Sequence, residues 1–124
     1  MTRRMSCSMT IEAVRNHTKT VTRRHVDTWK DLKPGDQLTL IEKGMGLPKG
    51  ARQVVLAEVQ VVAVSVEAVG LIHGDPFGTA DEGLFSMTPG DFVTFWLRAH
   101  GYGDRVNDPR RGDTPCRRIE WRYL

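Results

Sequence analysis

The feature that most constrains the fold is the valine-rich run at residues 53–66. Its apolar side chains recur at every second position, which is the period of a β-strand with one buried face. They belong to Val55, Ala57, Val59, Val61 and Ala63. Glu58 and Gln60 interrupt the opposite face. We therefore predict a long, bent strand that forms the spine of a small sheet.

Local signals place the other elements around this strand. Helices are predicted at residues 11–17 and from Thr88 to a stop at Gly101, with Thr10 and Thr88 as N-caps. Further strands are predicted at residues 5–9, 18–24, 37–42 and 116–124. The order β-α-β-β-β-α-β favours an α+β fold, a small β-barrel or curved mixed sheet with two main helices packed on it. We expect one domain over residues 1–124, with residues 1–5 as a flexible N-terminus.

The second helix and the loop after the third strand carry further side chains of interest. Phe92, Phe95, Trp96 and Ala99 share one helical face, which we interpret as core. Residues 43–50 contain glycines, a proline and two lysines. We interpret this segment as a long hairpin connection, and alternatively as a loop that grips a ligand.

A polar run between the first helix and the next strand is the candidate floor of a site. It reads Thr18-Lys19-Thr20-Val21-Thr22-Arg23-Arg24. Three hydroxyls and three positive charges are too polar for a core strand, and the β-branched residues disfavour a helix interior. Such side chains can hold a phosphate or attack a carbonyl group.

The charge distribution points to an anionic partner. Residues 1–24 carry six Lys and Arg against one acid, and residues 105–124 carry six against three, whereas residues 25–104 carry six against eleven. If the two chain ends are adjacent, they form one basic face that suits a polyanion such as a nucleic acid. The alternative is that these arginines are solvated and maintain solubility.

Composition excludes several other classes. The four histidines are scattered singly and the two cysteines, Cys7 and Cys116, lie near opposite ends, so we predict no metal site and no cofactor. No apolar run approaches the roughly 20 residues of a membrane span, and no secretory signal is recognised. We expect a cytoplasmic protein with reduced cysteines and no membrane partner.

The order and spacing of these motifs resemble the ASCH family, within the PUA-like superfamily of small β-barrels. The resemblance covers residues 6–124 and rests on a short helix leading into Lys19-Thr20-Val21-Thr22-Arg23-Arg24 and on the turn Leu32-Lys33-Pro34-Gly35-Asp36. It continues through Ala80-Asp81-Glu82-Gly83, the helix after Thr88 and the strand with Ile119-Glu120-Trp121. The loop at residues 42–47 is similar to that of small ASCH proteins of bacteriophages and prophages. The family usually has glycine where this chain has His17.

The resemblance implies a nucleic-acid-binding protein, chiefly for RNA, with a cleft beside the barrel. Some relatives resemble a bacterial amidohydrolase that deacetylates N4-acetylcytidine, and others are regarded as ribonucleases. In the amidohydrolase, the lysine and second threonine of the motif act with a glutamate ahead of the last helix. The matching residues are Lys19, Thr22 and Glu82. Each also has an ordinary interpretation, as a solvated or phosphate-contacting lysine, a strand threonine and a solvated turn acid.

Two functions follow as hypotheses. As a binding module, the cleft takes a nucleoside, a nucleotide or single-stranded RNA, and Lys19 and Glu82 read a base edge. Phosphates are then contacted by Thr20, Arg23, Arg24 and Lys43. As an amidohydrolase, the protein uses Thr22 as nucleophile and Lys19 as base, which a tight Lys19–Glu82 pair would oppose. Further alternatives are a ribonuclease and a phage protein, in the host cytoplasm, that binds a host protein.

Overall fold

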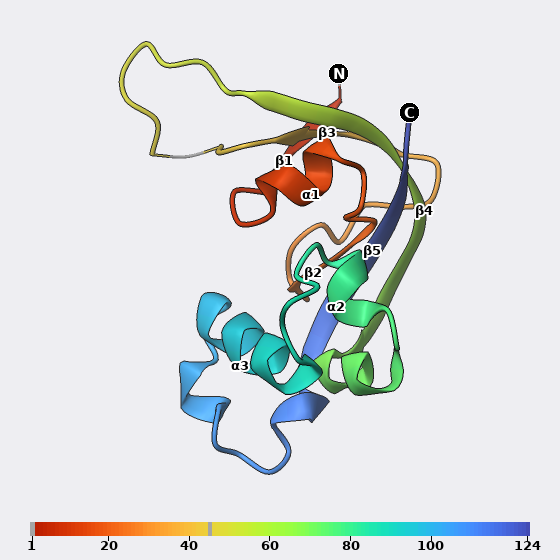
Figure 1. Ribbon diagram of the computed structural model, residues 1–124, viewed down its shortest axis with the longest axis vertical. Helices are drawn as coiled ribbons and strands as arrows, with labels where there is room; N and C mark the ends of the chain where they lie inside the picture. Colours follow the sequence, from red (N-terminus) through yellow and green to blue (C-terminus); the bar gives the residue numbers. More distant parts are fainter. Residues whose placement is uncertain (1, 45) are drawn as a thin grey trace.

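One five-stranded mixed sheet, in the order β1-β3-β4-β5-β2, curls into a half-barrel in the computed structural model (Figure 1), which describes residues 2–44 and 46–124. The strands are β1 (Arg3–Ser6), β2 (Val21–His25), β3 (Gln37–Ile41), β4 (Val55–Ala68) and β5 (Pro115–Tyr123). β1 pairs with β3 in parallel, and all other neighbours are antiparallel. The predicted α+β class with a curved mixed sheet is confirmed, and its shape is compatible with a PUA-like barrel.

The first strand begins earlier than predicted. β1 starts at Arg3, in register with Leu38 of β3, and ends at Ser6. Residues 3–5, which we expected in a flexible N-terminus, are therefore hydrogen-bonded into the sheet. Residues 7–9 follow the strand as a turn, and Met1 lies outside the described residues.

β4 is the predicted spine, but its buried face is shorter than the alternation indicated. Val59 and Val61 are fully buried, whereas Val55, at the start of β4 next to the β3–β4 connection, is 48% exposed. Between Val61 and Ala63 the pairing with β5 shifts by one residue. This bulge leaves Val62 exposed and reverses the alternation, so that Val64 packs on the core after it. The connection at residues 42–54 is the hairpin that we predicted.

The α-helices are α1 (Ile11–Arg15), α2 (Gly78–Asp81) and α3 (Pro89–Ala99). Short 3-10 helices cover Val69–Gly74, Gly103–Arg105 and Arg111–Asp113. The cap of α3 is as predicted, because the Thr88 hydroxyl accepts a hydrogen bond from the Asp91 amide at 3.1 Å. The cap of α1 is not, because the side chain of Thr10 makes no capping bond and instead lines a cavity.

The core face of α3 differs from the aromatic stripe that we predicted. Phe92 and Trp96 are buried, together with Val93 and Leu97, against the 3-10 helix at Val69–Gly74. Phe95 is half-buried and Ala99 is exposed. Two overlapping stripes satisfy a helical period, and packing against the 3-10 helix at Val69–Gly74 buries the one that contains the two aliphatic residues.

Replacing the α3 cap tests how far this helix depends on Thr88. Thr88→Ala leaves the Asp91 amide without its side-chain acceptor, and we expect a loss of about 1 kcal/mol in the free energy of unfolding. Urea denaturation measures this loss. Thr88→Ser keeps the hydroxyl and serves as the control, and equal losses in both variants would contradict a capping role.

Candidate functional site

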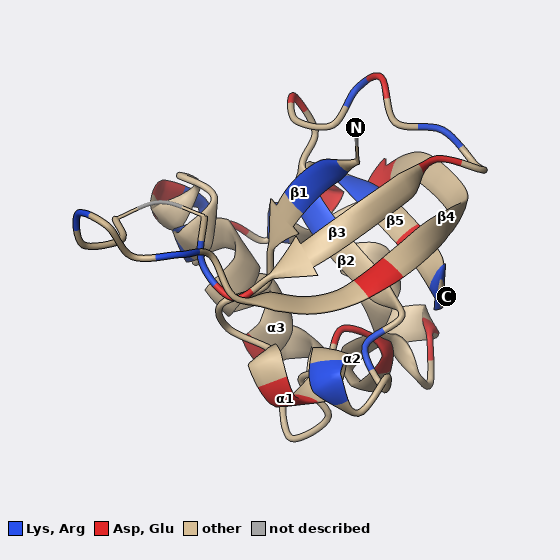
Figure 2. Cartoon of the chain, turned by 90° about the horizontal axis from the view of Figure 1, so that it is seen from above, with Lys and Arg blue, Asp and Glu red and all other residues tan. Residues whose placement is uncertain are grey.

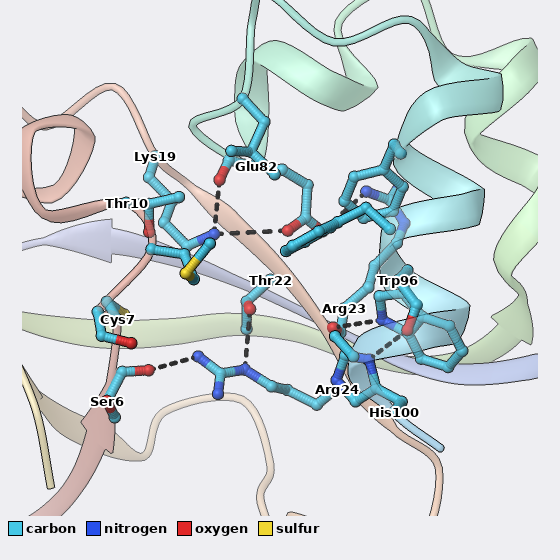
Figure 3. Close-up of a pocket in the computed structure, with 16 residues that line it drawn as sticks. Ser6, Cys7, Thr10, Lys19, Thr22, Arg23, Arg24, Glu82, Trp96 and His100 are labelled. Atoms are coloured by element: carbon cyan, nitrogen blue, oxygen red, sulfur yellow. Dashed lines mark hydrogen bonds and ion pairs between the residues drawn. The ribbon is translucent and has the colours of Figure 1, made fainter. Parts of the chain in front are cut away.

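A cavity of about 230 Å³ lies where the curled sheet stays open, between its two edge strands β1 and β2. Figure 3 shows its lining side chains converging from β1, β2, the loop after α2 and helix α3. The charged and polar members are Ser6, Cys7, Ser8, Thr10, Lys19, Thr22, Arg23, Arg24, Glu82 and His100. The apolar members are Met9, Leu84, Phe92, Phe95, Trp96 and Ala99.

Lys19 and Glu82 form a buried pair in this cavity, and each residue is only 4% exposed. The ammonium of Lys19 donates to the Glu82 backbone carbonyl at 2.6 Å, and its Nζ lies 3.4 Å from the carboxylate Oε1 (Figure 3). Neither residue is therefore the solvated side chain of the ordinary interpretation. Because an ammonium has three N–H groups, two acceptors on Glu82 leave one donor for a ligand.

The other oxygen of the same carboxylate binds Arg23. The guanidinium Nη1 donates to Glu82 Oε2 at 3.0 Å, and Nε lies 3.7 Å from Glu67 Oε2. Arg23 is 3% exposed, and its backbone carbonyl accepts from Trp96 Nε1 at 2.8 Å. Arg23 is thus committed to two carboxylates, which compensate its buried charge.

Thr22 and Arg24 lie on β2, on either side of Arg23 in the sequence, and both line the cavity. The Nε group of Arg24 donates to Thr22 Oγ1 at 3.0 Å, and Nη2 donates to the Ser6 carbonyl at 2.8 Å. Arg24 therefore bridges the two edge strands across the opening (Figure 3). Among the described residues, no hydrogen bond joins Thr22 directly to Lys19, so the expected nucleophile–base contact is absent from this geometry.

The backbone of Lys19 is held from the neighbouring strand β5. Its carbonyl accepts hydrogen bonds from Trp121 Nε1, at 3.0 Å, and from the Tyr123 hydroxyl. His17 has a φ of +64°, in the left-handed region that favours glycine. Here the imidazole stacks on the Tyr123 ring, with centroids 4.1 Å apart. The left-handed conformation is therefore adopted here by a residue other than glycine.

Glu82 is brought into the cavity by a close approach between the loop after α2 and helix α1. Gly83 follows it with a φ of +83°, and a Cβ there would lie 2.7 Å from the Cβ of Ala13 on α1. The amide of Thr20 donates to the Asp81 carbonyl at 2.8 Å. These contacts tie the loop after α2 to the segment before β2, which sets the carboxylate opposite Lys19.

The structure brings five of the seven predicted site residues together and leaves two apart. The five that line the cavity are Lys19, Thr22, Arg23, Arg24 and Glu82. Thr20 is not among the residues that line the cavity, and Lys43 is exposed on the β3–β4 connection. Cys7, Trp96 and His100 also line the cavity, although they were not predicted as site residues and no sequence motif marks them.

Burial keeps three lining or neighbouring groups neutral. It raises the pKa of the Cys7 thiol, and it raises the pKa of Cys116 to about 12. Burial lowers the pKa of His100, so that its imidazole is neutral at pH 7. His100 Nδ1 lies 2.8 Å from the Trp96 carbonyl, which only accepts, so Nδ1 carries the proton and Nε2 is an acceptor. Three cations and one carboxylate then leave the cavity lining positive.

The two basic chain ends do not form the single basic face that we predicted. They meet on the neighbouring strands β2 and β5, where Arg23 is in register with Arg118, and β1 faces β2 across the open edge of the sheet. Acids accompany the arginines, as in the Arg3–Asp31 pair at 2.7 Å and the Arg118 pair with Glu120 at 3.0 Å. Figure 2 shows basic and acidic segments interspersed.

Two further findings concern the described part of the chain. Residues 2–44 and 46–124 contain no cluster of three or more His, Cys, Asp or Glu residues with the arrangement of a metal site. Within the same residues, no helix has the length and apolar character needed to cross a bilayer.

Comparison with known proteins identifies the fold. No family model matches the sequence, and no curated protein matches it. The crystal structure of hypothetical protein PH0355 is similar over the full length of both chains, with a TM-score of 0.62 and 16% identity. The crystal structure of EF3133 from Enterococcus faecalis V583, of family DUF984, has a TM-score of 0.61 and 13% identity, over all of this chain and 76% of that one. At these identities, the likeness shows the fold alone.

The buried carboxylate can be tested by removing its charge. Glu82→Gln leaves Lys19 and Arg23 without their shared counter-charge, and we expect a loss of roughly 3–5 kcal/mol in the free energy of unfolding. Glu120→Gln is the matched control, because its pair with Arg118 is partly exposed and is expected to contribute about 1 kcal/mol or less. Similar unfolding free energies for the two variants would show that the buried network is not stabilising.

Proposed function

We propose that the cavity binds one nucleobase, presented by a nucleoside, by a nucleotide or by single-stranded RNA. The observation that carries this proposal is the convergence of Lys19, Thr22, Arg24 and Glu82 on one small cavity with aromatic side chains in its wall. Flat apolar surfaces with a few fixed donors and acceptors are what a base requires.

The size of the cavity supports a single base rather than a larger ligand. Pockets for drug-sized molecules span about 300–1,000 Å³, and this cavity has about 230 Å³. Phe92 and Trp96 supply apolar wall from α3, and His100 stacks on Trp96 with centroids 4.3 Å apart. A planar heterocycle fits such a wall, with its sugar at the open side.

The polar groups supply both senses of hydrogen bond for a base edge. Lys19 offers a donor, and Glu82 offers the remaining lone pairs of its carboxylate. Arg24 is half-buried and presents a cation towards a carbonyl or phosphate oxygen. We expected Arg23 to contact a phosphate, but in this proposal it orients the Glu82 carboxylate. Lys43 contacts phosphates of the ligand outside the cavity. Membership of the ASCH family belongs to the same proposal and is supported by the fold and by this convergence.

Nucleoside titrations test the proposal. We expect saturable binding of at least one member of a panel made of the four ribonucleosides and N4-acetylcytidine, measured by calorimetry and by quenching of tryptophan fluorescence. Arg24→Gln removes a charged donor, and we expect roughly 10-fold to 100-fold weaker binding, because hydrogen bonds to charged groups contribute about 1.5–3 kcal/mol. Arg98→Gln, on the outer side of α3, is the matched control. Absence of saturable binding both across the panel and to a short single-stranded RNA would refute the proposal.

Amidohydrolysis is the second candidate, and the Thr22–Arg24 contact favours it. Because Thr22 Oγ1 accepts from Arg24, the hydroxyl proton is free to be donated elsewhere, and the guanidinium stabilises negative charge on the oxygen. Lys19 lines the same cavity but is bonded to Glu82. Proton abstraction by Lys19 therefore requires that the ammonium first passes a proton to the Glu82 carboxylate.

The proposed reaction has two stages. Thr22 Oγ1 bonds to the acyl carbon of N4-acetylcytidine while its proton moves to neutral Lys19, and the C–N bond then breaks as the departing amine takes a proton from the protonated Glu82. Water next adds to the acyl carbon of the threonine ester, acetate leaves with one proton shed to solvent, and the hydroxyl of Thr22 is restored. After the first stage Lys19 is again an ammonium and Glu82 a carboxylate, so the cycle ends with the pair in its starting state.

Product analysis separates this candidate from binding alone. We expect wild-type protein to convert N4-acetylcytidine to cytidine and acetate, followed by liquid chromatography. Thr22→Ala should abolish turnover while nucleoside binding persists, and Thr22→Ser should retain part of the activity because it keeps the hydroxyl. Binding of N4-acetylcytidine without turnover by the wild type would remove the hydrolase and leave the binding module.

A further inference from the structure

We propose that the groove beside the cavity, formed around Met9 and Phe85, is a stacking platform for a nucleobase adjacent to the one in the cavity. The inference rests on the proposed function and deepens it, since it makes the preferred ligand a base within single-stranded RNA rather than a free nucleoside.

The exposed apolar area at this groove needs an explanation. Phe85 is 78% exposed and Met9 is 69% exposed, the two largest values among the bulky apolar side chains of residues 2–44 and 46–124. Both side chains line one groove between α1 and the loop after α2. Large apolar side chains that are exposed together mark surfaces that contact a partner.

The groove adjoins the cavity. Met9 lines both of them, so its side chain forms a shared wall. On the opposite loop, Glu82 and Leu84 line the cavity while the next residue, Phe85, lines the groove. A strand whose base enters the cavity therefore passes Met9 and Phe85 with its next nucleotide.

The platform is held in place before any ligand arrives. The close approach of Gly83 to Ala13 fixes the loop against α1, and the amide of Leu84 donates to the Thr79 carbonyl at 2.8 Å. The backbone that leads into Phe85 is thus fixed by one close approach and one hydrogen bond. A preorganised aromatic ring loses little conformational entropy when a base stacks on it.

The polar residues of the groove suit a nucleotide. Ser8, Asn16 and Thr18 line it, and they offer hydroxyl and amide groups to a base edge or a 2′-hydroxyl. Its one carboxylate, on Glu12, lies 3.2 Å from Arg15 Nη1, so the charge that would repel a phosphate is compensated. Stacking accepts any base, because every base has a π-face.

The test compares two short RNA probes that carry the same phosphates. One is an oligocytidylate, and in the other every nucleotide except one central cytidine is abasic. Fluorescence anisotropy gives both affinities at one salt concentration, since the phosphate contribution depends on salt. We expect the wild type to bind the full oligocytidylate about 5-fold to 150-fold more tightly, the equivalent of about 1–3 kcal/mol for one stacked base.

Two phenylalanine variants locate the effect. Phe85→Ala should abolish the preference for the full oligocytidylate while leaving the affinity for a free nucleoside unchanged. Phe77→Ala is the matched control, because Phe77 is 67% exposed and lines neither the cavity nor the groove. Circular dichroism verifies that both variants are folded.

The outcomes separate this inference from the function on which it rests. Equal affinity of the wild type for the two probes, or a preference that survives Phe85→Ala, overturns the stacking platform while nucleoside binding still stands. Failure of every nucleoside and both probes to bind overturns the cavity proposal as well. Self-association that Phe85→Ala abolishes in sedimentation equilibrium would assign the groove to a second copy of the chain and likewise overturn the inference.

Discussion

The carboxylate of Glu82 is the group on which the rest of the site depends. It faces the ammonium of Lys19 with one oxygen and the guanidinium of Arg23 with the other, in a region where all three side chains are almost fully buried. Two such cations cannot remain charged in the interior without a counter-charge and hydrogen bonds. The arrangement is therefore both a stabilising network and a set of oriented polar groups, and its structural and chemical roles rest on the same contacts.

The fold places these groups by leaving the sheet incomplete. β1 and β2 are the two edges of the curl, and the cavity occupies the gap that a further strand would fill in a closed barrel. β5 adds Trp121 and Tyr123 as donors to the Lys19 carbonyl, so the central sheet fixes the backbone of the site. Helix α3 closes the apolar side. Each element that borders the cavity thus contributes either a wall or a hydrogen bond.

Sequence patterns predicted which helices and strands exist better than the residues at which each begins and ends. The alternation of apolar residues in β4 could not indicate the bulge near Val62. A bulge is one extra residue relative to the partner strand, so it becomes apparent only when the pairing with β5 is known. Proximity of Thr22 to Arg24 follows from the two-residue period of a strand. Glu82 lies 63 positions from Lys19, so its place came from the family resemblance and not from periodicity. Trp96 was interpreted as a core residue, because core packing explains its place on the helix, and no motif marks His100 as a cavity residue.

The Arg24 bridge to Ser6 has a consequence for how this protein behaves at high concentration. Edge strands offer free amides and carbonyls to other chains, and exposed edges invite sheet-to-sheet polymerisation. Here the two edges face each other across a narrow opening, and a charged side chain spans it. A strand from another chain would have to displace that guanidinium and enter the positively charged cavity. The contact between Arg24 and Ser6 therefore disfavours the pairing of another chain with these two edges.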